Sequence, residues 1–195
     1  MAERLRLAAA DRRRVLDWLL QRGLSGIEPT GQAFETMSTT SLPLGGERGE
    51  LLFKLYQHPG RYRREVNALG KLTGSGYGPD LLRHGPLQPA LQLGHQRSRR
   101  ELNWTFFVLR TWLPGAPGVA ADADRDRLAK AMYAFADFCA LHQLRIGEMK
   151  PDSFIYRADR LTWIDFDGFR NDDGHQEPLR EHNRRYLRQR FERLA

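Results

Sequence analysis

The sequence predicts an α+β fold divided into two lobes, on the basis of three features of the chain. Residues 25–44 are rich in Thr, Ser and Gly with isolated apolar residues, a composition that favours strands and turns. Residues 124–142 repeat apolar side chains at the spacing of a long helix, and the Pro- and Gly-rich residues 114–118 separate the two regions. A chain of 195 residues is long enough for one domain or for two small lobes that share a cleft. We predict an N-terminal helix at 1–24, an N-terminal lobe at 25–113 and a C-terminal lobe at 114–195.

Composition indicates a soluble globular protein, cytoplasmic or peripheral at a membrane. The chain is 41% hydrophobic and 28% charged, and no apolar run approaches the length of about eighteen residues that a transmembrane helix needs. We expect no secretory signal, because charged residues interrupt the N-terminus. The single cysteine, Cys139, excludes an internal disulfide and a zinc cluster of several thiolates, and its helical surroundings predict burial.

The net charge of +7 comes mainly from arginine, whose planar fork binds pairs of anionic oxygens. Candidate partners are therefore a nucleotide, a nucleic acid, an anionic glycolipid or the inner face of a membrane, and charge alone does not separate these. The chain has no basic strand motif interleaved with aromatic residues of the kind found in RNA modules, which makes nucleic acid the weakest of these candidates.

Residues 11–24 have the pattern of a helix, with Asp11 as the expected N-cap and Gly23 as the expected end. Its arginines at positions 12, 13 and 14 form either an anion-binding patch or an ordinary solvated face. Three strands are then predicted, at 27–30, 34–42 and 50–56. Gly31, Gln32 and Ala33 join the first two strands, and residues 45–49 form a hairpin turn before the third.

Lys54 lies within the apolar strand ELLFKLY, where a lysine needs either solvent or a counter-charge. Residues 61–72 have helical spacing that places Glu65 on one stripe with Leu69 and Leu72, facing inward. Two interpretations follow: Lys54 and Glu65 form an ion pair, or the lysine is on an exposed edge strand and the glutamate is solvated.

The next segments are a short strand near residues 81–82, a proline-rich excursion through Pro86 and Pro89, and a polar loop at 95–101. The aromatic and β-branched residues 104–113 predict a buried strand. A final helix is expected at 178–194. The helix at 124–142 has four core positions, Leu128, Met132, Phe135 and Cys139.

The stretch LHQLRIGEMKPDSFIYRADRLTWIDFDGFR, residues 141–170, concentrates the polar chemistry. Antiparallel strands at 154–156 and 161–164 would present two acidic loop ends side by side. Glu148 and Lys150 can face one pocket, and Ser153 and Asp165 offer the oxygen ligands that Mg²⁺ prefers. This pattern suits phosphoryl transfer, although a Lys-Pro turn between a helix and a hairpin is also consistent with a purely structural turn.

The same stretch resembles the H-R-D-L-K-P-E-N and D-F-G segments of the protein-kinase-like superfamily. With Lys150 and the proline after it as anchor, the resemblance places Glu148 at the catalytic Asp and Lys150 at the lysine that approaches the transferred phosphate. It likewise places Ser153 at the metal-binding Asn and Asp165 at the metal-binding Asp.

In the N-terminal lobe the resemblance implies that Lys54 and Glu65 are the ion pair that holds nucleotide phosphates. It also implies that Gly31, between the first two strands, belongs to the phosphate loop, although no full GxGxxG is present. Backbone groups of Thr111, Trp112 and Leu113, at the end of the strand before the Pro- and Gly-rich connector, would face an adenine ring. ATP and Mg²⁺ are the implied cofactors.

Taken together, these motifs resemble the small bacterial lipopolysaccharide kinases that act on the Kdo sugar, in which IDFD replaces DFG, and the PhoP-regulatory-network kinase-like proteins. The implied fold is a compact two-lobed kinase-like one, with a small antiparallel N-lobe sheet and one helix, and a reduced, mostly helical C-lobe. The implied function is ATP-dependent phosphate transfer to a small-molecule or glycolipid sugar hydroxyl. Because Glu and Ser replace the usual Asp and Asn, the alternative is a weak or inactive pseudokinase with a regulatory binding role.

Overall fold

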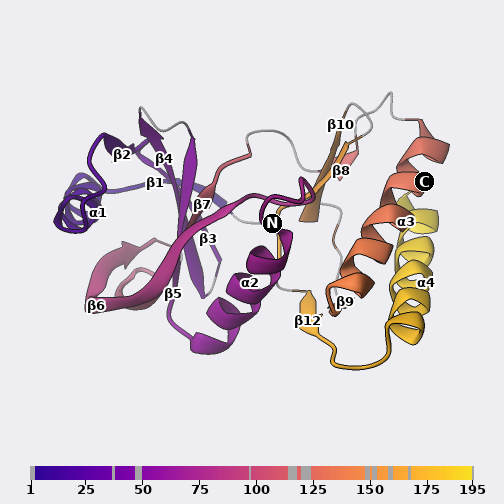
Figure 1. Cartoon of the computed structure of the whole chain (residues 1–195). Coiled ribbons are helices and arrows are strands. Elements are labelled where there is room, and N and C mark those ends of the chain that lie inside the picture. The colour runs from indigo at the N-terminus through magenta and orange to yellow at the C-terminus, as the bar shows by residue number, and fades with distance from the viewer. Residues whose placement is uncertain are drawn as a thin grey trace. The chain divides into compact units, whose positions relative to one another are not determined.

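The computed structural model confirms the predicted α+β class. Its described residues form four helices and, among other strands, a seven-stranded antiparallel sheet (Figure 1). The chain divides into a first unit, Met1–Arg63 with Leu81–Leu113, and a second unit, Arg64–Asp80 with Pro114–Ala195. The structure describes residues 3–36, 38–46, 50–96, 98–113, 118–119, 124–147, 150, 153–157, 160–166 and 168–194.

The first unit contains the large sheet and the first helix. Its elements are β1 (Glu3–Arg6), α1 (Ala9–Gln21), β2 (Ile27–Pro29), β3 (Gln32–Glu35), β4 (Thr39–Gly46), β5 (Leu51–Tyr56), β6 (Leu81–His95) and β7 (Arg100–Thr111). Helix α2 (Pro59–Leu72) begins in the first unit and ends in the second. The second unit also contains β8 (Gly118–Val119), α3 (Arg125–Leu141), β9 (Leu144–Ile146), β10 (Phe154–Arg157), β11 (Arg160–Trp163), β12 (Phe169–Asn171) and α4 (Gln176–Leu194).

The strands of the large sheet follow the order β1-β3-β4-β5-β7-β6, and β2 also pairs with β4. The predicted strand at 34–42 is wrong, because the chain reverses between Thr36 and Thr39. The Thr36 N–H donates to the Thr39 carbonyl at 2.9 Å, and the two hydroxyls lie 2.8 Å apart. Threonine hydroxyls that bond to nearby main-chain groups in this way favour a turn over a continuous strand.

Pro86 and Pro89 lie within the 15-residue strand β6, so the predicted proline-rich excursion is wrong. Strand β6 is at the edge of the sheet, and its register against β7 shifts between Pro86 and Leu91. Proline cannot donate a ladder hydrogen bond, so edge strands and irregular positions are where a sheet tolerates it. Local composition therefore indicated a break where tertiary pairing permits a strand.

Helix α1 begins at Ala9, two residues before the predicted N-cap, so the N-cap assignment of Asp11 is wrong. The buried Asp11 carboxylate instead accepts the Gly94 N–H at 3.1 Å and bonds Arg14 at 3.2 Å, which ties the helix to β6. The predicted end is confirmed. Gly23 has φ +69, and the Gly23 and Leu24 N–H groups donate back to the last turn of the helix, as in a glycine C-cap.

The core of the first unit lies between α1 and one face of the sheet. Trp18 of α1 packs against Phe53 and Phe107, with ring centroids 5.2 and 4.9 Å apart. Side chains alternate between the two faces of a strand, so Phe53 of β5 enters this core while its neighbours Leu52 and Lys54 project to the opposite face. The sheet is thus buried on both faces along β5, whose six residues are all buried.

In the second unit α3 and α4 lie side by side (Figure 1). The predicted helix at 124–142 is confirmed, with Asp124 as its N-cap: the carboxylate accepts the N–H groups of Asp126 and Arg127 at 2.9 and 3.1 Å. Phe135 of α3 stacks on Trp163 of β11 with centroids 5.0 Å apart, and Phe154 packs against the same indole. The four predicted core positions are all buried: Leu128, Met132, Phe135 and Cys139.

Strands β9 and β12 have three residues each and escaped sequence analysis. They pair with each other, and β9 is also bonded to the side chain of Asn183 on α4. The Asn183 amide accepts the Ile146 N–H and donates to the Leu144 carbonyl, both at 2.9 Å. The amide therefore acts like one residue of a neighbouring strand and fixes β9 on the helix.

Replacing Asn183 by Ala should destabilise the second unit. Asn183 is 0% exposed, so the Ile146 N–H and the Leu144 carbonyl lose their amide partner without gaining water, at about 1–3 kcal/mol each. Chemical unfolding followed by circular dichroism should report a loss of about 2 to 4 kcal/mol. Arg185→Ala, an exposed position two residues away, should stay within about 0.5 kcal/mol of the parent. Equal effects of the two variants would show that the amide bonds contribute nothing.

Candidate active site

Main-chain hydrogen bonds join two segments of the second unit, GEMKPDS (residues 147–153) and DFDG (residues 165–168). The Gly147 N–H donates to the Gly168 carbonyl at 2.8 Å. The Ser153 carbonyl accepts two N–H groups, from Ile164 at 2.9 Å and from Asp165 at 3.2 Å. The two segments are therefore fixed to each other at both ends of GEMKPDS.

Gly147 is required by the closeness of this approach. A Cβ atom at this position would lie 2.9 Å from the Gly168 carbonyl oxygen, closer than real Cβ contacts. The preceding residue, Ile146, pairs with Phe169 in the β9–β12 ladder, so the contact continues a short antiparallel sheet. Because the clash would be with main chain rather than with a flexible side chain, any larger residue must separate the two segments.

Ser153 closes the GEMKPDS segment on itself. Its hydroxyl oxygen accepts the Lys150 N–H at 3.1 Å, and its own N–H donates to the Lys150 carbonyl at 3.0 Å. The residue is 2% exposed. The structure therefore brings the two predicted metal ligands, Ser153 and Asp165, together through their main chains, with one acceptor site of the serine hydroxyl already in use.

The Asp165 main chain is held between buried aromatic residues. The Trp163 indole N–H donates to the Asp165 carbonyl, and the next residue, Phe166, is fully buried against Phe169. The Asp165 residue itself is partly exposed. An oxygen ligand at the solvent edge of a rigid main chain fits the preference of Mg²⁺ for carboxylates that leave room for water.

The structure describes one of the two predicted catalytic residues. Lys150 is exposed, at the turn closed by Ser153. Glu148 lies outside the described residues, so its role as catalytic base stays a prediction.

Lys54 is in β5, an interior strand between β4 and β7, so the alternative of an exposed edge-strand lysine is wrong. The residue is 9% exposed, and its ammonium lies 5.5 Å from the centroid of the Tyr56 ring. Its neighbours across the ladder are Ser41 and Val108. An ammonium group is stable at such a buried position only where polar or anionic groups contact it.

Glu65 is on the buried side of α2, as its spacing predicted, and is 1% exposed. The pairing of Glu65 with Lys54 stays a prediction, since the two residues belong to different units. The end of α2 is fixed within the second unit by Lys71, which donates to the Gln143 carbonyl at 3.3 Å and to the Asn171 side chain at 2.9 Å. Partial burial lowers the Lys71 pKa from its ordinary value, with Asp173 opposing the shift.

Gly31 has φ +85 and lies between β2 and β3, which both pair with β4. Gly31 therefore does not join two strands that pair with each other. The turn containing Thr36 and Ser38 does, since it joins β3 to β4. A bond from Arg61 to the Ser38 hydroxyl, 2.5 Å long, fixes this turn within the first unit. Any contact of Gly31 with a nucleotide stays a prediction.

The three residues predicted to face adenine are half-buried at the end of β7. Thr111 pairs with Leu51 across the ladder. The Trp112 N–H already donates to the Glu50 carbonyl at 2.9 Å, and its ring stacks on Phe34 with centroids 5.8 Å apart. A contact from Trp112 to a planar base would therefore involve its ring or carbonyl oxygen. The role of Leu113 stays a prediction.

Sequence reasoning missed the residues that hold the site together, chiefly Asn183, Gly147 and Asn171. One signal was present. Asn183 falls between Leu179 and Leu187 at spacings of four, so an amide occupies a position on an otherwise apolar stripe of a helix. A polar residue on such a stripe needs a buried partner, which points to a structural hydrogen bond.

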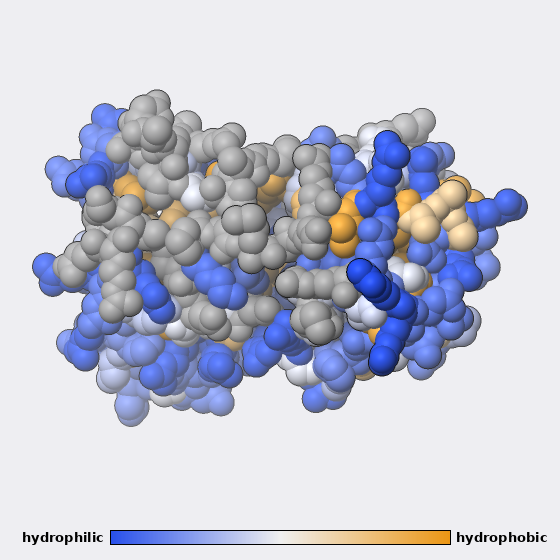
Figure 2. Space-filling view, turned by 180° about the vertical axis from the view of Figure 1, so that it is seen from behind, coloured by the Kyte–Doolittle hydropathy of each residue, from blue (hydrophilic) through white to orange (hydrophobic). Residues whose placement is uncertain are grey.

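The surface is rich in charge. Figure 2 shows hydrophilic residues spread over most of the described part of one face of the molecule, with hydrophobic residues in small areas. Some arginines have acidic partners: Arg184 of α4 donates to Asp137 of α3 at 2.6 Å, and this bond raises the Arg184 pKa.

Within the described part of the chain, no helix is both long and apolar enough to cross a bilayer.

No protein-family model matches the chain, and no curated protein sequence matches it. Solved kinase structures do match. The PK-1 kinase of Cydia pomonella granulovirus gives a TM-score of 0.54 at 8% identity, over 82% of this chain and 60% of that one. The Rio2 kinase of Chaetomium thermophilum, solved with ADP, Mg²⁺ and phosphoaspartate, gives a TM-score of 0.57 at 12% identity, over 92% of this chain and 60% of that one.

The chain thus spans about 60% of the length of each of these two kinases. At such low sequence identity the likeness concerns the fold alone. It agrees with the antiparallel sheet of the first unit and with the helices and short strands of the second. The chain has a protein-kinase-like fold.

Proposed function

We propose that the protein is an ATP-dependent phosphotransferase that acts on the hydroxyl of a small molecule or of a glycolipid sugar. The main support is the connection of GEMKPDS and DFDG by main-chain hydrogen bonds, which keeps Ser153 beside Asp165. The kinase-like fold adds to this support. The choice of a sugar acceptor rests on the resemblance of the IDFD motif to lipopolysaccharide kinases acting on Kdo. The PhoP-network kinase-like proteins share the compact size and a loop centred on Lys-Pro with altered catalytic positions.

The proposal assigns the kinase roles to named residues of this chain. Lys54, with Glu65 as its counter-charge, holds the nucleotide phosphates. Asp165, assisted by Ser153, holds Mg²⁺, which when bound offsets negative charge on the phosphate oxygens. The exposed Lys150 ammonium approaches the transferred phosphoryl group.

Glu148 would accept the proton of the acceptor hydroxyl, which requires it to reach within about 2.6–3.2 Å of that oxygen. Phosphoryl transfer depends mainly on positioning and charge, so the fixed relation of GEMKPDS to DFDG matters more than the extra methylene of glutamate over aspartate. On the nucleotide side, the turn with Thr36 and Ser38 is a better candidate for the phosphate loop than Gly31, since it joins two strands that pair with each other, β3 and β4.

A pseudokinase with a regulatory binding role is the second candidate, and one observation favours it. The Ser153 hydroxyl is buried and already accepts the Lys150 N–H, which leaves it less able to serve as a metal ligand than the usual asparagine. Nucleotide binding without turnover is the behaviour that this alternative predicts.

Asp165→Asn should weaken Mg-ATP binding by roughly tenfold or more, because it removes the full negative charge assigned to the metal. The measurement is the thermal midpoint as ATP is titrated at fixed Mg²⁺, since a ligand that binds the native state must raise the midpoint. Asp173→Asn makes the same charge change at an exposed position and should leave the titration unchanged. An ATP response that Asp165→Asn leaves intact would contradict the metal assignment.

Gly147→Ala should separate GEMKPDS from DFDG, because the new Cβ meets the Gly168 carbonyl at 2.9 Å. Turnover should fall by roughly 10²-fold, the usual consequence of misplacing reacting groups by about 1 Å. Gly70→Ala is the matched control, as its Cβ in α2 meets nothing within 4 Å. The control should keep full activity and stability; similar losses in both variants would count against the role of the close approach.

Glu148→Gln tests the enzyme against the pseudoenzyme. If Glu148 is the base, turnover should fall by roughly 10²–10⁴-fold while the ATP-dependent thermal shift stays nearly unchanged. Turnover unaffected by the substitution would make the base assignment wrong. ATP binding with no turnover on any sugar or small-molecule acceptor, in the parent protein as well, would replace the catalytic proposal by the regulatory one.

A further inference from the structure

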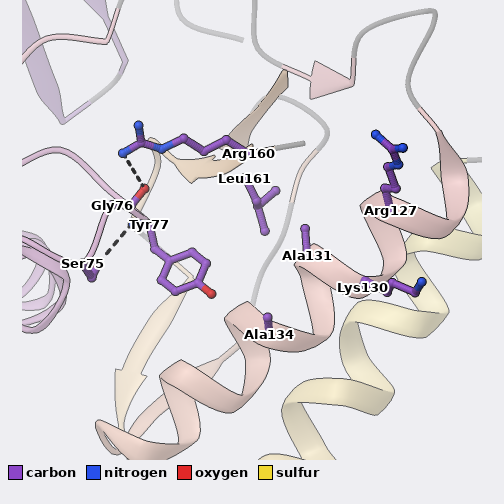
Figure 3. Close-up of a pocket in the computed structure, with 9 residues that line it drawn as sticks. All are labelled: Ser75, Gly76, Tyr77, Arg127, Lys130, Ala131, Ala134, Arg160 and Leu161. Atoms are coloured by element: carbon purple, nitrogen blue, oxygen red, sulfur yellow. Dashed lines mark hydrogen bonds between the residues drawn. The ribbon is translucent and has the colours of Figure 1, made fainter. Parts of the chain in front are cut away.

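A groove of about 620 Å³ lies on the second unit, and none of its lining residues is assigned above to catalysis, metal or nucleotide. One edge is formed by Arg160 of β11 with the main chain near Gly76, and the other by Arg127 and Lys130 of α3 (Figure 3). Between the two cationic edges lies an apolar floor. The floor residues are Tyr77, Ala131, Ala134 and Leu161.

The floor is rigid because it belongs to the aromatic core of the second unit. The Tyr77 carbonyl accepts the Trp163 N–H at 2.7 Å. The Tyr77 ring packs on the rings of Phe135 and Phe138, and its centroid lies 5.3 and 5.1 Å from theirs. Burial is the main cause that raises the Tyr77 pKa, which agrees with a ring held against the core.

Arg160 is held in place at its edge of the groove. Its guanidinium donates to the Gly76 carbonyl at 3.4 Å, the contact drawn in Figure 3. Gly76 has φ +79, and a Cβ there would lie 3.0 Å from the Arg160 Nη2 atom. A glycine is therefore what allows the guanidinium to lie against the main chain while its other N–H groups keep access to a ligand.

The positive charge of the groove is only partly offset. Arg127 lies 3.8 Å from Asp124, an exposed carboxylate at the start of α3. For Lys130 and Arg160, no carboxylate in the described ranges of the chain lies within ion-pair distance. Three cationic residues therefore line the groove, and two of them, Lys130 and Arg160, lack an acidic ion-pair partner among the described residues, which favours an anionic ligand.

We propose that this groove docks an extended acidic segment of a partner protein. An apolar side chain of the segment would lie on the floor, and carboxylates on either side of it would meet Arg160 at one edge and Arg127 with Lys130 at the other. Small ligands are usually buried over most of their surface, whereas this groove is open and its cations are exposed. An open apolar trough with two cationic edges matches alternating acidic and apolar side chains, and such charge complementarity sets specificity and association rate.

Lys130→Ala combined with Arg160→Ala tests the charged edges. The probe is a fluorescein-labelled short peptide with a central Leu flanked on each side by Asp and Glu, and binding is followed by anisotropy at physiological salt. The double variant should weaken binding by roughly fivefold to thirtyfold, the loss expected for two exposed ion pairs. Arg185→Ala combined with Arg188→Ala removes the same charge from α4 and should change the affinity by less than about twofold.

A second peptide with Gly in place of the central Leu tests the floor and should bind at least about fivefold more weakly. Equal weakening by the two double variants would show general charge attraction and overturn the proposal, as would equal binding of the Leu and Gly peptides. Anionic phosphatidylglycerol vesicles are a third probe: if only vesicles bind, and Lys130 and Arg160 are required, the groove is a lipid site instead. The ATP titration should be the same in all variants, which separates this test from that of the proposed function.

Discussion

Main-chain hydrogen bonds join GEMKPDS to DFDG at both ends, and the rest of the candidate site depends on them. The bond from Gly147 to Gly168 and the bond from Asp165 to Ser153 set the distance between the two segments whatever side chains they bear. Under the proposed function, these bonds would preserve the arrangement of the two segments where Glu148 and Ser153 replace the aspartate and asparagine usual in kinases. Those two side chains would then decide between phosphate transfer and nucleotide binding alone.

Three sets of contacts support this connection between GEMKPDS and DFDG. The amide of Asn183 on α4 fixes β9, which leads directly into Gly147. The aromatic core around Trp163 fixes β11, which leads into Asp165. The end of α2 is bonded through Lys71 to the Asn171 side chain, at the end of the strand that follows DFDG. The Asn183 bonds are buried, and buried polar bonds that are fully satisfied are strong and determine one arrangement of neighbouring elements.

The parts of the fold that sequence analysis predicted are those with a long or strongly alternating pattern: the helix at 124–142 and the hairpin of β10 and β11. The inward position of Glu65 also followed from its place on an apolar helical stripe, whereas for Lys54 the sequence left burial and exposure open. Strands β9 and β12 were missed because three residues are too few for a pattern. The prolines of β6 were misinterpreted because only pairing with a distant strand decides whether such residues end a strand or bend it.

Amide hydrogen exchange, resolved residue by residue by NMR, tests the central claim most directly. The N–H groups of Gly147, Ile164 and Asp165 all donate to main-chain carbonyls across the two segments. They should exchange slowly in the protein without ligand and with similar opening free energies, because one cooperative opening breaks all three bonds. Gly147→Ala should release them together while amides of α3 stay protected. Exchange of these three amides at the rate of an unstructured chain would contradict the account.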